Sequence, residues 1–98
     1  MTLDTAEPQA LKTMPAPFEL FHVIADPGCA RVRRYVADHE LVDVVRFRNV
    51  GFDEHLAKLK ARGGDGAVPA LWDGAALHVG AEAVIARLAA HHDVGRGG

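Results

Sequence analysis

Two apolar segments, one near the beginning and one near the middle of the chain, have the character of buried strands. Residues 18–24 are β-branched and aromatic, and only Glu19 and His22 interrupt their apolar character. Because a strand that is covered on both faces lacks the alternation of polar and apolar positions, this segment predicts a strand in the interior of a sheet. Residues 41–47 are rich in valine and predict a second strand.

The segment between these strands carries the signals of a helix. Asp26 can cap free backbone N–H groups with its carboxylate, and Pro27 fits the first helical position, where no N–H partner is needed. We expect this helix to run to about His39 or Glu40. The residues expected on its inner face are Ala30, Val32 or Arg33, Val36 and Ala37.

A second helix is predicted over residues 52–62. Phe52, Leu56 and Leu59 stand at positions i, i+4 and i+7 and therefore share one face of a helix. The glycine pair at 63–64 follows at the point where a helix C-terminus favours glycine.

The last third of the chain predicts a hairpin followed by a helix. Residues 67–72 and 75–79 have strand character and flank Asp73-Gly74, a dipeptide typical of tight antiparallel turns. From Gly80 onward, apolar residues recur with helical spacing and predict a last helix to about His91.

The predicted order of elements is β-α-β-α-β-β-α, which defines an α/β fold. A parallel first β-α-β unit and an antiparallel terminal hairpin give a four-stranded mixed sheet with helices on both faces. We expect residues 18–92 to form the domain. Residues 1–17, which contain three prolines, are predicted to be a flexible arm, and residues 93–98 a disordered tail.

Length, charge and cysteine content exclude several classes of function. With 98 residues the chain has room for one core, and a formal net charge of −2 gives no general attraction to nucleic acid. No apolar run approaches the roughly 20 residues of a membrane-spanning helix, and the first residues lack the features of a signal peptide. We therefore expect a cytoplasmic protein that binds neither nucleic acid nor a membrane. The single cysteine, Cys29, excludes an intramolecular disulfide, and the six histidines show no metal-ligand spacing, so no metal site is expected.

Three features resemble the glutaredoxin form of the thioredoxin fold, and they cover roughly residues 18–90. The turn Asp26-Pro27-Gly28-Cys29 follows the first strand where glutaredoxins carry their C-P-Y-C active-site motif. Val68-Pro69 stands just before the hairpin, where the family has a cis-proline that faces the active site. The hairpin, Gly80 and the helix after it are similar to the end of the glutaredoxin fold and of the N-terminal domain of glutathione transferases. The resemblance implies a thioredoxin-like (glutaredoxin-type) fold with a cis peptide bond before Pro69; the alternative is an ordinary trans proline at a strand start.

The resemblance leaves two alignments of the active-site turn open. In the alignment without gaps, Asp26 takes the position of the nucleophilic cysteine and Cys29 that of the second cysteine, so the nucleophile is missing. A carboxylate cannot carry out thiol-disulfide exchange, which needs an attacking thiolate. In the other alignment, which needs an insertion before the helix, Cys29 is the nucleophile and Val32 replaces the second cysteine. The N–H groups of the helix start and the nearby Arg31, Arg33 and Arg34 are then expected to lower the thiol pKa. Without either role, Asp26 is simply a helix cap and Cys29 an inert buried thiol.

The resemblance also implies a candidate site for glutathione. In the families concerned, main-chain groups beside the cis-proline hold the cysteinyl part, the start of the last helix holds the γ-glutamyl end, and basic side chains hold the glycyl carboxylate. The corresponding positions are Val68 and Pro69 for the first element, Gly80 and Ala81 for the second, and Arg31 or Arg62 for the third. The second element lacks the polar side chains that the families have there, although its backbone N–H groups at a helix start can still bind a carboxylate.

The leading hypothesis is a redox-inactive binding module with a degenerate active-site turn. It would bind glutathione or an extended peptide segment between Asp26-Pro27 and Val68-Pro69 and would require no cofactor. One alternative is a monothiol glutathione-dependent thiol-disulfide oxidoreductase that uses Cys29. A second alternative is a half-domain similar to the N-terminal domain of glutathione transferases.

Overall fold

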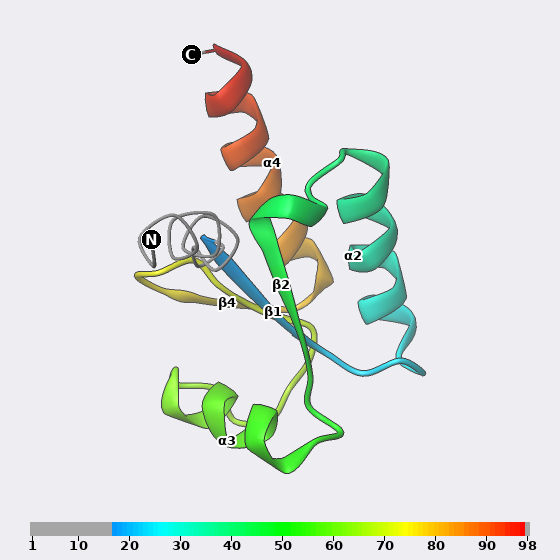
Figure 1. Cartoon of the computed structure of the whole chain (residues 1–98), viewed down its shortest axis with the longest axis vertical. Coiled ribbons are helices and arrows are strands. Elements are labelled where there is room, and N and C mark those ends of the chain that lie inside the picture. The colour runs from blue at the N-terminus through cyan, green and yellow to red at the C-terminus, as the bar shows by residue number, and fades with distance from the viewer. Residues whose placement is uncertain (1–16, 98) are drawn as a thin grey trace, which may run out of the picture.

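The computed structural model describes residues 17–97, including the side chains as far as residue 91. Helices and strands alternate along most of this part of the chain (Figure 1). In chain order they are β1 (Phe18–His22), α2 (Pro27–Asp38), the short 3-10 helix η1 (Val42–Val44), β2 (Val45–Asn49), α3 (Asp53–Ala61), β3 (Ala70–Trp72), β4 (Leu77–Val79) and α4 (Ala81–Gly97).

The strands form one mixed sheet in the order β2-β1-β3-β4. β1 pairs in parallel with β2, from Phe18 opposite Val45 to His22 opposite Asn49. β1 also pairs antiparallel with β3, and β3 pairs antiparallel with β4. The predicted α/β class, the order of elements, the four-stranded mixed sheet and the interior position of the first strand are all confirmed.

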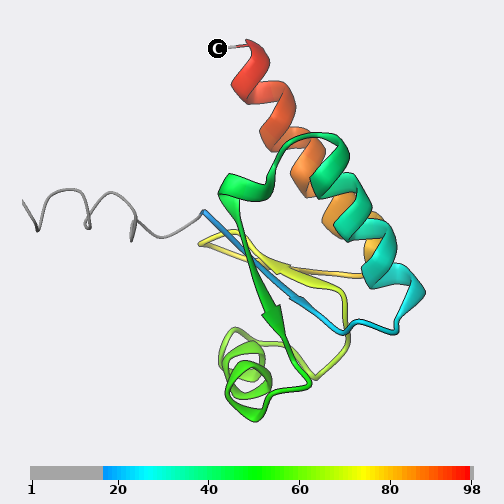
Figure 2. The same ribbon diagram turned by 45° about the vertical axis from the view of Figure 1, so that its right-hand side comes forward.

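Helices cover the sheet from both sides, as expected. α2 and α4 lie next to each other on one face, and α3 lies on the other (Figure 2). The core under α2 and α4 includes Phe18 and Leu20 of β1 packed with Leu88 of α4. The smaller core under α3 is built from Phe21, Leu59 and Ala70, with Val68 and Trp72 at its margin. Successive side chains of β1 therefore serve opposite cores, as the pleat of a strand requires.

Both parallel strands are shorter than predicted. β1 ends at His22, because the backbone groups of the next two residues bind side chains: the Val23 N–H faces the sulfur of Cys29, and Arg33 donates to the Val23 and Ile24 carbonyls. Ile24 is consequently exposed. β2 begins only at Val45, since this residue already lies opposite the first residue of β1 and the preceding residues have no strand beside them. Residues 42–44 form the 3-10 helix η1 instead of the predicted strand.

The hairpin forms at the predicted turn, with shorter strands. Asp73 N–H donates to the Ala76 carbonyl at 3.1 Å, so the loop spans four residues. Gly74 has a φ of 95°, a conformation that glycine adopts without a Cβ penalty. The Asp73 carboxylate holds the loop together by accepting from the N–H groups of Ala75 and Ala76 at 2.8 and 2.7 Å.

The inner faces of the helices are confirmed in part. In α2, Val32 and Val36 are buried as predicted, whereas Ala30 and Ala37 are exposed and Arg33 is half-buried. The buried stripe of α2 begins instead at Cys29, which stands three residues before Val32. In α3, Leu59 is buried, but the predicted inner residue Phe52 is the exposed residue that precedes the helix.

The last helix is longer than predicted. α4 continues to Gly97, six residues past the expected end at His91, so the predicted tail at residues 93–97 is helical. The segment directly after His91 contains no proline or glycine until Gly95, and nothing in it forces an end. Residues 1–16 of the predicted arm at 1–17 and Gly98 of the predicted tail lie outside the described residues. Between residues 17 and 97, no helix is both long and apolar enough to cross a membrane.

Candidate functional site

The start of α2 meets the proline-led strand, as the resemblance implies. The Val68–Pro69 peptide bond is cis. A methyl group placed on Gly28 would lie 3.4 Å from the Cδ of Pro69 and 3.7 Å from the Cβ of Ala81. Three segments that are far apart in the sequence therefore come into contact: the first turn of α2, the residues before β3, and the start of α4. We call this contact region, made by residues 26–29, 68–69 and 80–81, the junction.

Asp26 is the N-cap of α2. Its backbone is extended, with φ −82° and ψ 127°, and its Oδ2 accepts the N–H of Cys29 at 2.8 Å. Its carbonyl accepts the first helical bond, from Ala30 N–H at 3.0 Å. Pro27 follows as the first helical residue, which confirms the predicted start of the helix. The carboxylate thus stabilises the turn at the place where the gap-free alignment puts the nucleophile of glutaredoxins.

Cys29 is fully buried. Its side chain is 0% exposed, because it lies on the same stripe of α2 as the core residues Val32 and Val36. The Val23 N–H is 3.4 Å from its sulfur. Burial is the largest influence and raises the pKa of the thiol. The hydrogen bond from Val23 lowers the pKa, the neighbouring Asp26 carboxylate raises it, and Arg33 lowers it slightly, so that the pKa stays above its ordinary value. Such a thiol is mostly protonated at neutral pH and is not reached by solvent, so this geometry suits packing rather than nucleophilic attack.

The proline side of the junction offers backbone groups. Pro69 is buried, and its carbonyl accepts the Gly80 N–H at 2.8 Å, which ties the start of α4 to β3. Val68 is half-buried, and within the described part of the chain no hydrogen bond to its main chain is found. Ala81, half-buried, opens the 17-residue helix α4 with the free N–H groups that a helix start has.

Arg31 lies beside the junction. It is exposed, and it lines a shallow hollow of about 380 Å³ together with Pro27, Ala30 and Arg34 on one stripe of α2. The hollow shares Pro27 with the junction and has two guanidinium groups at its side. The prediction of Arg62 as the other basic partner is wrong. Arg62 lies at the end of α3, on the opposite side of the sheet from α2, and forms an ion pair with Glu19. It cannot serve the junction.

A partly buried contact between Arg33 and His22 supports the loop before α2, and it was not foreseen from the sequence. Arg33 Nη1 is 3.1 Å from His22 Nδ1 and 3.0 Å from the carbonyl oxygen of Val23. Burial lowers the pKa of His22, and the charge of Arg33 lowers it further, as does His55. The neutral imidazole can accept from Arg33. The only signal in the sequence was Arg33 as an alternative to Val32 on the inner face of the helix.

Comparison with known proteins provides no relative on which to base the interpretation of the junction. No protein-family model, no curated protein and no solved structure matches this chain. Within residues 17–97, no group of three or more histidine, cysteine, aspartate or glutamate side chains could hold a metal ion.

Proposed function

We propose that the chain is a glutaredoxin-like, thioredoxin-fold binding module that performs no thiol-disulfide chemistry of its own. Its ligand is glutathione or an extended peptide segment, held at the junction. The observation that carries the proposal is the close approach of Gly28 to Pro69 and Ala81, beside a turn in which Asp26 caps the helix. This is the arrangement expected if the resemblance extends to the binding site.

The lack of redox activity follows from the two side chains of the turn. Disulfide exchange starts with a thiolate that attacks sulfur, and a carboxylate at the first position cannot do this. Cys29 is 0% exposed and its pKa is raised by burial, so it does not replace the missing nucleophile. The same observations speak against the monothiol oxidoreductase.

Binding draws on three kinds of group around the junction. The main chain of Val68 can pair with an extended ligand in the manner of an added strand. The N–H groups in the first turn of α4, beginning at Ala81, favour a carboxylate, whereas the Gly80 N–H is already bound to the Pro69 carbonyl. The guanidinium group of Arg31 stands in the adjoining hollow and can hold a second carboxylate. Glutathione carries both carboxylates and an extended backbone between them.

An NMR titration of the 15N-labelled protein with reduced glutathione tests the proposal. We expect chemical-shift changes at Gly28, Val68 and Ala81, and weaker binding by Arg31→Ala. The matched control is Arg46→Ala, which removes an exposed arginine from β2 and leaves the junction unchanged. The absence of shifts at the junction, with both millimolar glutathione and a short extended peptide, would contradict the proposal.

Alkylation of Cys29 tests the absence of redox activity separately. We expect iodoacetamide to modify the thiol only after unfolding, and we expect no hydroxyethyl-disulfide reduction above that of Cys29→Ser. A native thiol that reacts with an apparent pKa well below about 8.5 would instead support the monothiol oxidoreductase.

A further inference from the structure

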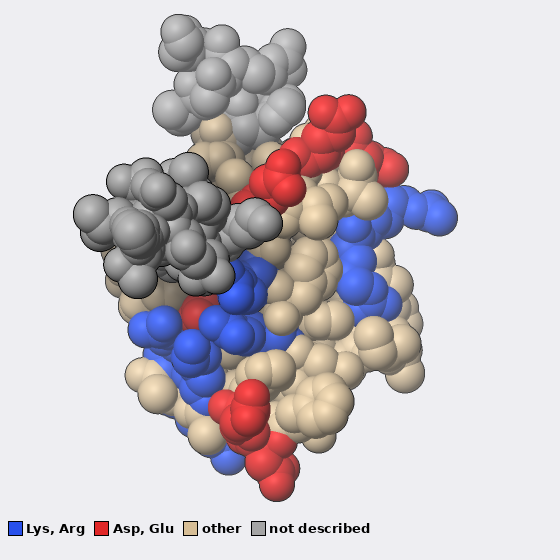
Figure 3. Space-filling model, viewed as in Figure 1, with Lys and Arg blue, Asp and Glu red and all other residues tan. Residues whose placement is uncertain are grey.

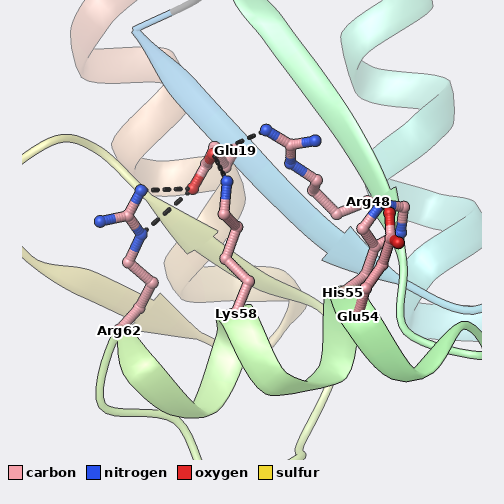
Figure 4. A network of polar contacts seen from close by, with 6 residues as sticks. All are labelled: Glu19, Arg48, Glu54, His55, Lys58 and Arg62. Carbon is pink, nitrogen blue, oxygen red and sulfur yellow. Dashed lines mark hydrogen bonds and ion pairs between the residues drawn. The ribbon is translucent and has the colours of Figure 1, made fainter.

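A basic cluster lies on the other side of the sheet from α2. Arg48 of β2, and Lys58 and Arg62 of the α3 segment, surround the carboxylate of Glu19 on β1 (Figure 4). Arg48 Nη2 and Lys58 Nζ lie 2.9 and 3.4 Å from Glu19 Oε2, and Arg62 Nη2 lies 3.1 Å from Oε1. The Glu19 side chain is only 12% exposed, so this ion cluster is partly shielded from water.

The cluster has more positive than negative charge. One carboxylate faces three cations. Burial alone would raise the pKa of Glu19, but Arg48, Arg62 and Lys58 together lower it by more. Glu19 therefore stays ionised. The Nε atom of Arg48 is buried without a hydrogen-bond partner among the described residues. Arg46 adds a further cation: it is exposed and lies opposite Glu19 in the parallel register, which places both side chains on the same face of the sheet.

We call Arg46, Arg48, Lys58 and Arg62, with the enclosed Glu19, the basic face. Figure 3 shows lysine and arginine side chains gathered over α3 and the strands beside it. This local excess of positive charge contrasts with the formal net charge of −2 for the whole chain. The acidic residues of α3, Asp53 and Glu54, stand in its first turn, whereas Lys58 lies near its other end.

Apolar side chains border the basic face. Trp72 lies directly opposite Glu19 across the β1–β3 pairing, and Leu77 lies opposite Trp72 across the hairpin. Both are half-buried and pack at the margin of the core under α3. The Arg62 guanidinium lies 4.8 Å from the centre of the Trp72 ring, as in a cation–π contact. A partner on this surface would meet cations and apolar side chains next to each other.

We propose that the basic face binds an acidic segment of a partner protein, with apolar residues of that segment placed toward Trp72 and Leu77. The excess cations supply the charge complementarity, which brings specificity and faster association. A nucleic acid fits less well, because the Glu19 carboxylate in the centre would repel phosphates and because Arg62 already occupies a face of the Trp72 ring that a base would need for stacking. This proposal does not rest on the junction, which lies on different elements.

The test uses the full chain and a short fluorescein-labelled peptide of glutamate and leucine residues. Trp72, the single tryptophan, reports the location of binding through its fluorescence, since its ring contacts Arg62. We expect salt-sensitive binding that quenches or shifts this fluorescence. Arg46 is exposed and is not one of the three ion-pair partners of Glu19. The variant Arg46→Glu is expected to weaken the affinity for the peptide by about fivefold or more.

Two matched variants with the same change of charge serve as controls. Lys60→Glu reverses an exposed charge on α3 that does not share the Lys58 face, and Arg31→Glu reverses one beside the junction. Both are expected to bind nearly as tightly as the original chain. Four outcomes would overturn the proposal. The peptide does not bind, Lys60→Glu and Arg46→Glu lose equal affinity for it, or only Arg31→Glu loses affinity. The fourth outcome is tighter binding of a single-stranded oligonucleotide than of the peptide. Loss only in Arg31→Glu would place the acidic ligand at the junction, so the two proposals can fail separately.

Discussion

Replacing Asp26 by cysteine tests whether position 26 is the place where sulfur chemistry would begin. In the present chain Asp26 Oδ2 accepts the Cys29 N–H at 2.8 Å, at the first turn of α2. Asp26→Cys puts a sulfur next to the same free N–H groups and turns the motif into a C-P-G-C sequence. We expect the new thiol to be acidic and to form a disulfide with Cys29.

The expected rise in the thiolate fraction of the new thiol follows from its position at the start of a helix. An ordinary thiol with a pKa of about 8.5 is about 3% thiolate at pH 7, whereas thiols at helix N-termini have pKa values of about 3.5–7.5 and are at least about 24% thiolate. The thiolate fraction therefore rises by about eightfold or more. The Asp26 carboxylate raises the pKa of Cys29, and a thiolate at position 26 would carry the same charge, so Cys29 is expected to stay protonated until the disulfide forms. Loss of the cap opposes these gains with a cost of about 0.5–2 kcal/mol in stability.

Three measurements check this prediction. The pH dependence of the ultraviolet absorbance of the thiolate gives the pKa of the new thiol, mass spectrometry under mild oxidation detects the disulfide, and the hydroxyethyl-disulfide assay measures turnover. Asp26→Ser is the matched control, because it keeps a capping oxygen and adds no sulfur. The double variant Asp26→Cys/Cys29→Ser isolates the new thiol.

A folded Asp26→Cys protein whose new thiol has a pKa at or above about 8.5 would refute the reasoning. It would show that the N–H groups at the start of α2 do not stabilise an anion on a side chain at position 26. Failure to form the disulfide, with a low pKa retained, would show that Cys29 is held too firmly in the core to act as a second cysteine.

Three further predictions concern the supports of the junction and of the sheet. Gly28→Val places a branched side chain in the junction, where even a single methyl group would lie 3.1 Å from Asp26 Oδ2 and 3.4 Å from the Cδ of Pro69. The variant should destabilise the fold by about 1–3 kcal/mol and weaken ligand binding. Unchanged melting and NMR titration curves would show that the junction has room for the larger side chain. Glu19→Gln leaves three cations without their carboxylate and should lower the free energy of unfolding in urea by about 2 kcal/mol, a value between those for exposed and buried ion pairs. The control Glu54→Gln, at a side chain that is 82% exposed, should change this free energy hardly at all. Equal effects of the two variants would contradict the prediction. Burial and a nearby positive charge lower the pKa of His22 in the folded state, so the unfolded state binds the proton first, and stability should be full above about pH 6.5 and decrease as the pH falls below it. A His22→Gln variant should lose this part of the pH dependence, and an identical slope in both proteins would exclude His22 as its source.

Local signals in the sequence were sufficient for the elements that nearby residues control. Asp26 and Pro27 predicted the start of α2, since the capping oxygen and its N–H donor are three residues apart. Asp73-Gly74 predicted the hairpin, because the turn is closed by its own side chain and by a glycine at positive φ. The order of these elements also predicted the mixed sheet, since short connections and right-handed crossovers leave few arrangements.

The ends of the elements depended on partners that periodicity does not reveal. β1 stops at His22 because Cys29 and Arg33, on the following helix, take the backbone groups of the next residues. The segment before Val45 has strand-type sequence, but no neighbouring strand lies beside it, so it becomes η1. Strand propensity acts only where another strand completes the hydrogen bonds.

The sequence by itself determined the helix start at Asp26, the hairpin, and the succession of elements that defines the sheet. Only the tertiary structure decided that Cys29 is buried, that Gly28 faces Pro69 and Ala81 with room for no more than a small side chain between them, and that Arg62 serves the opposite face of the sheet. The physical reason is the distance along the chain. A cap or a turn is closed by residues two to four positions apart, whereas Glu19 and Arg62 lie 43 positions apart and meet only after the sheet and α3 have packed.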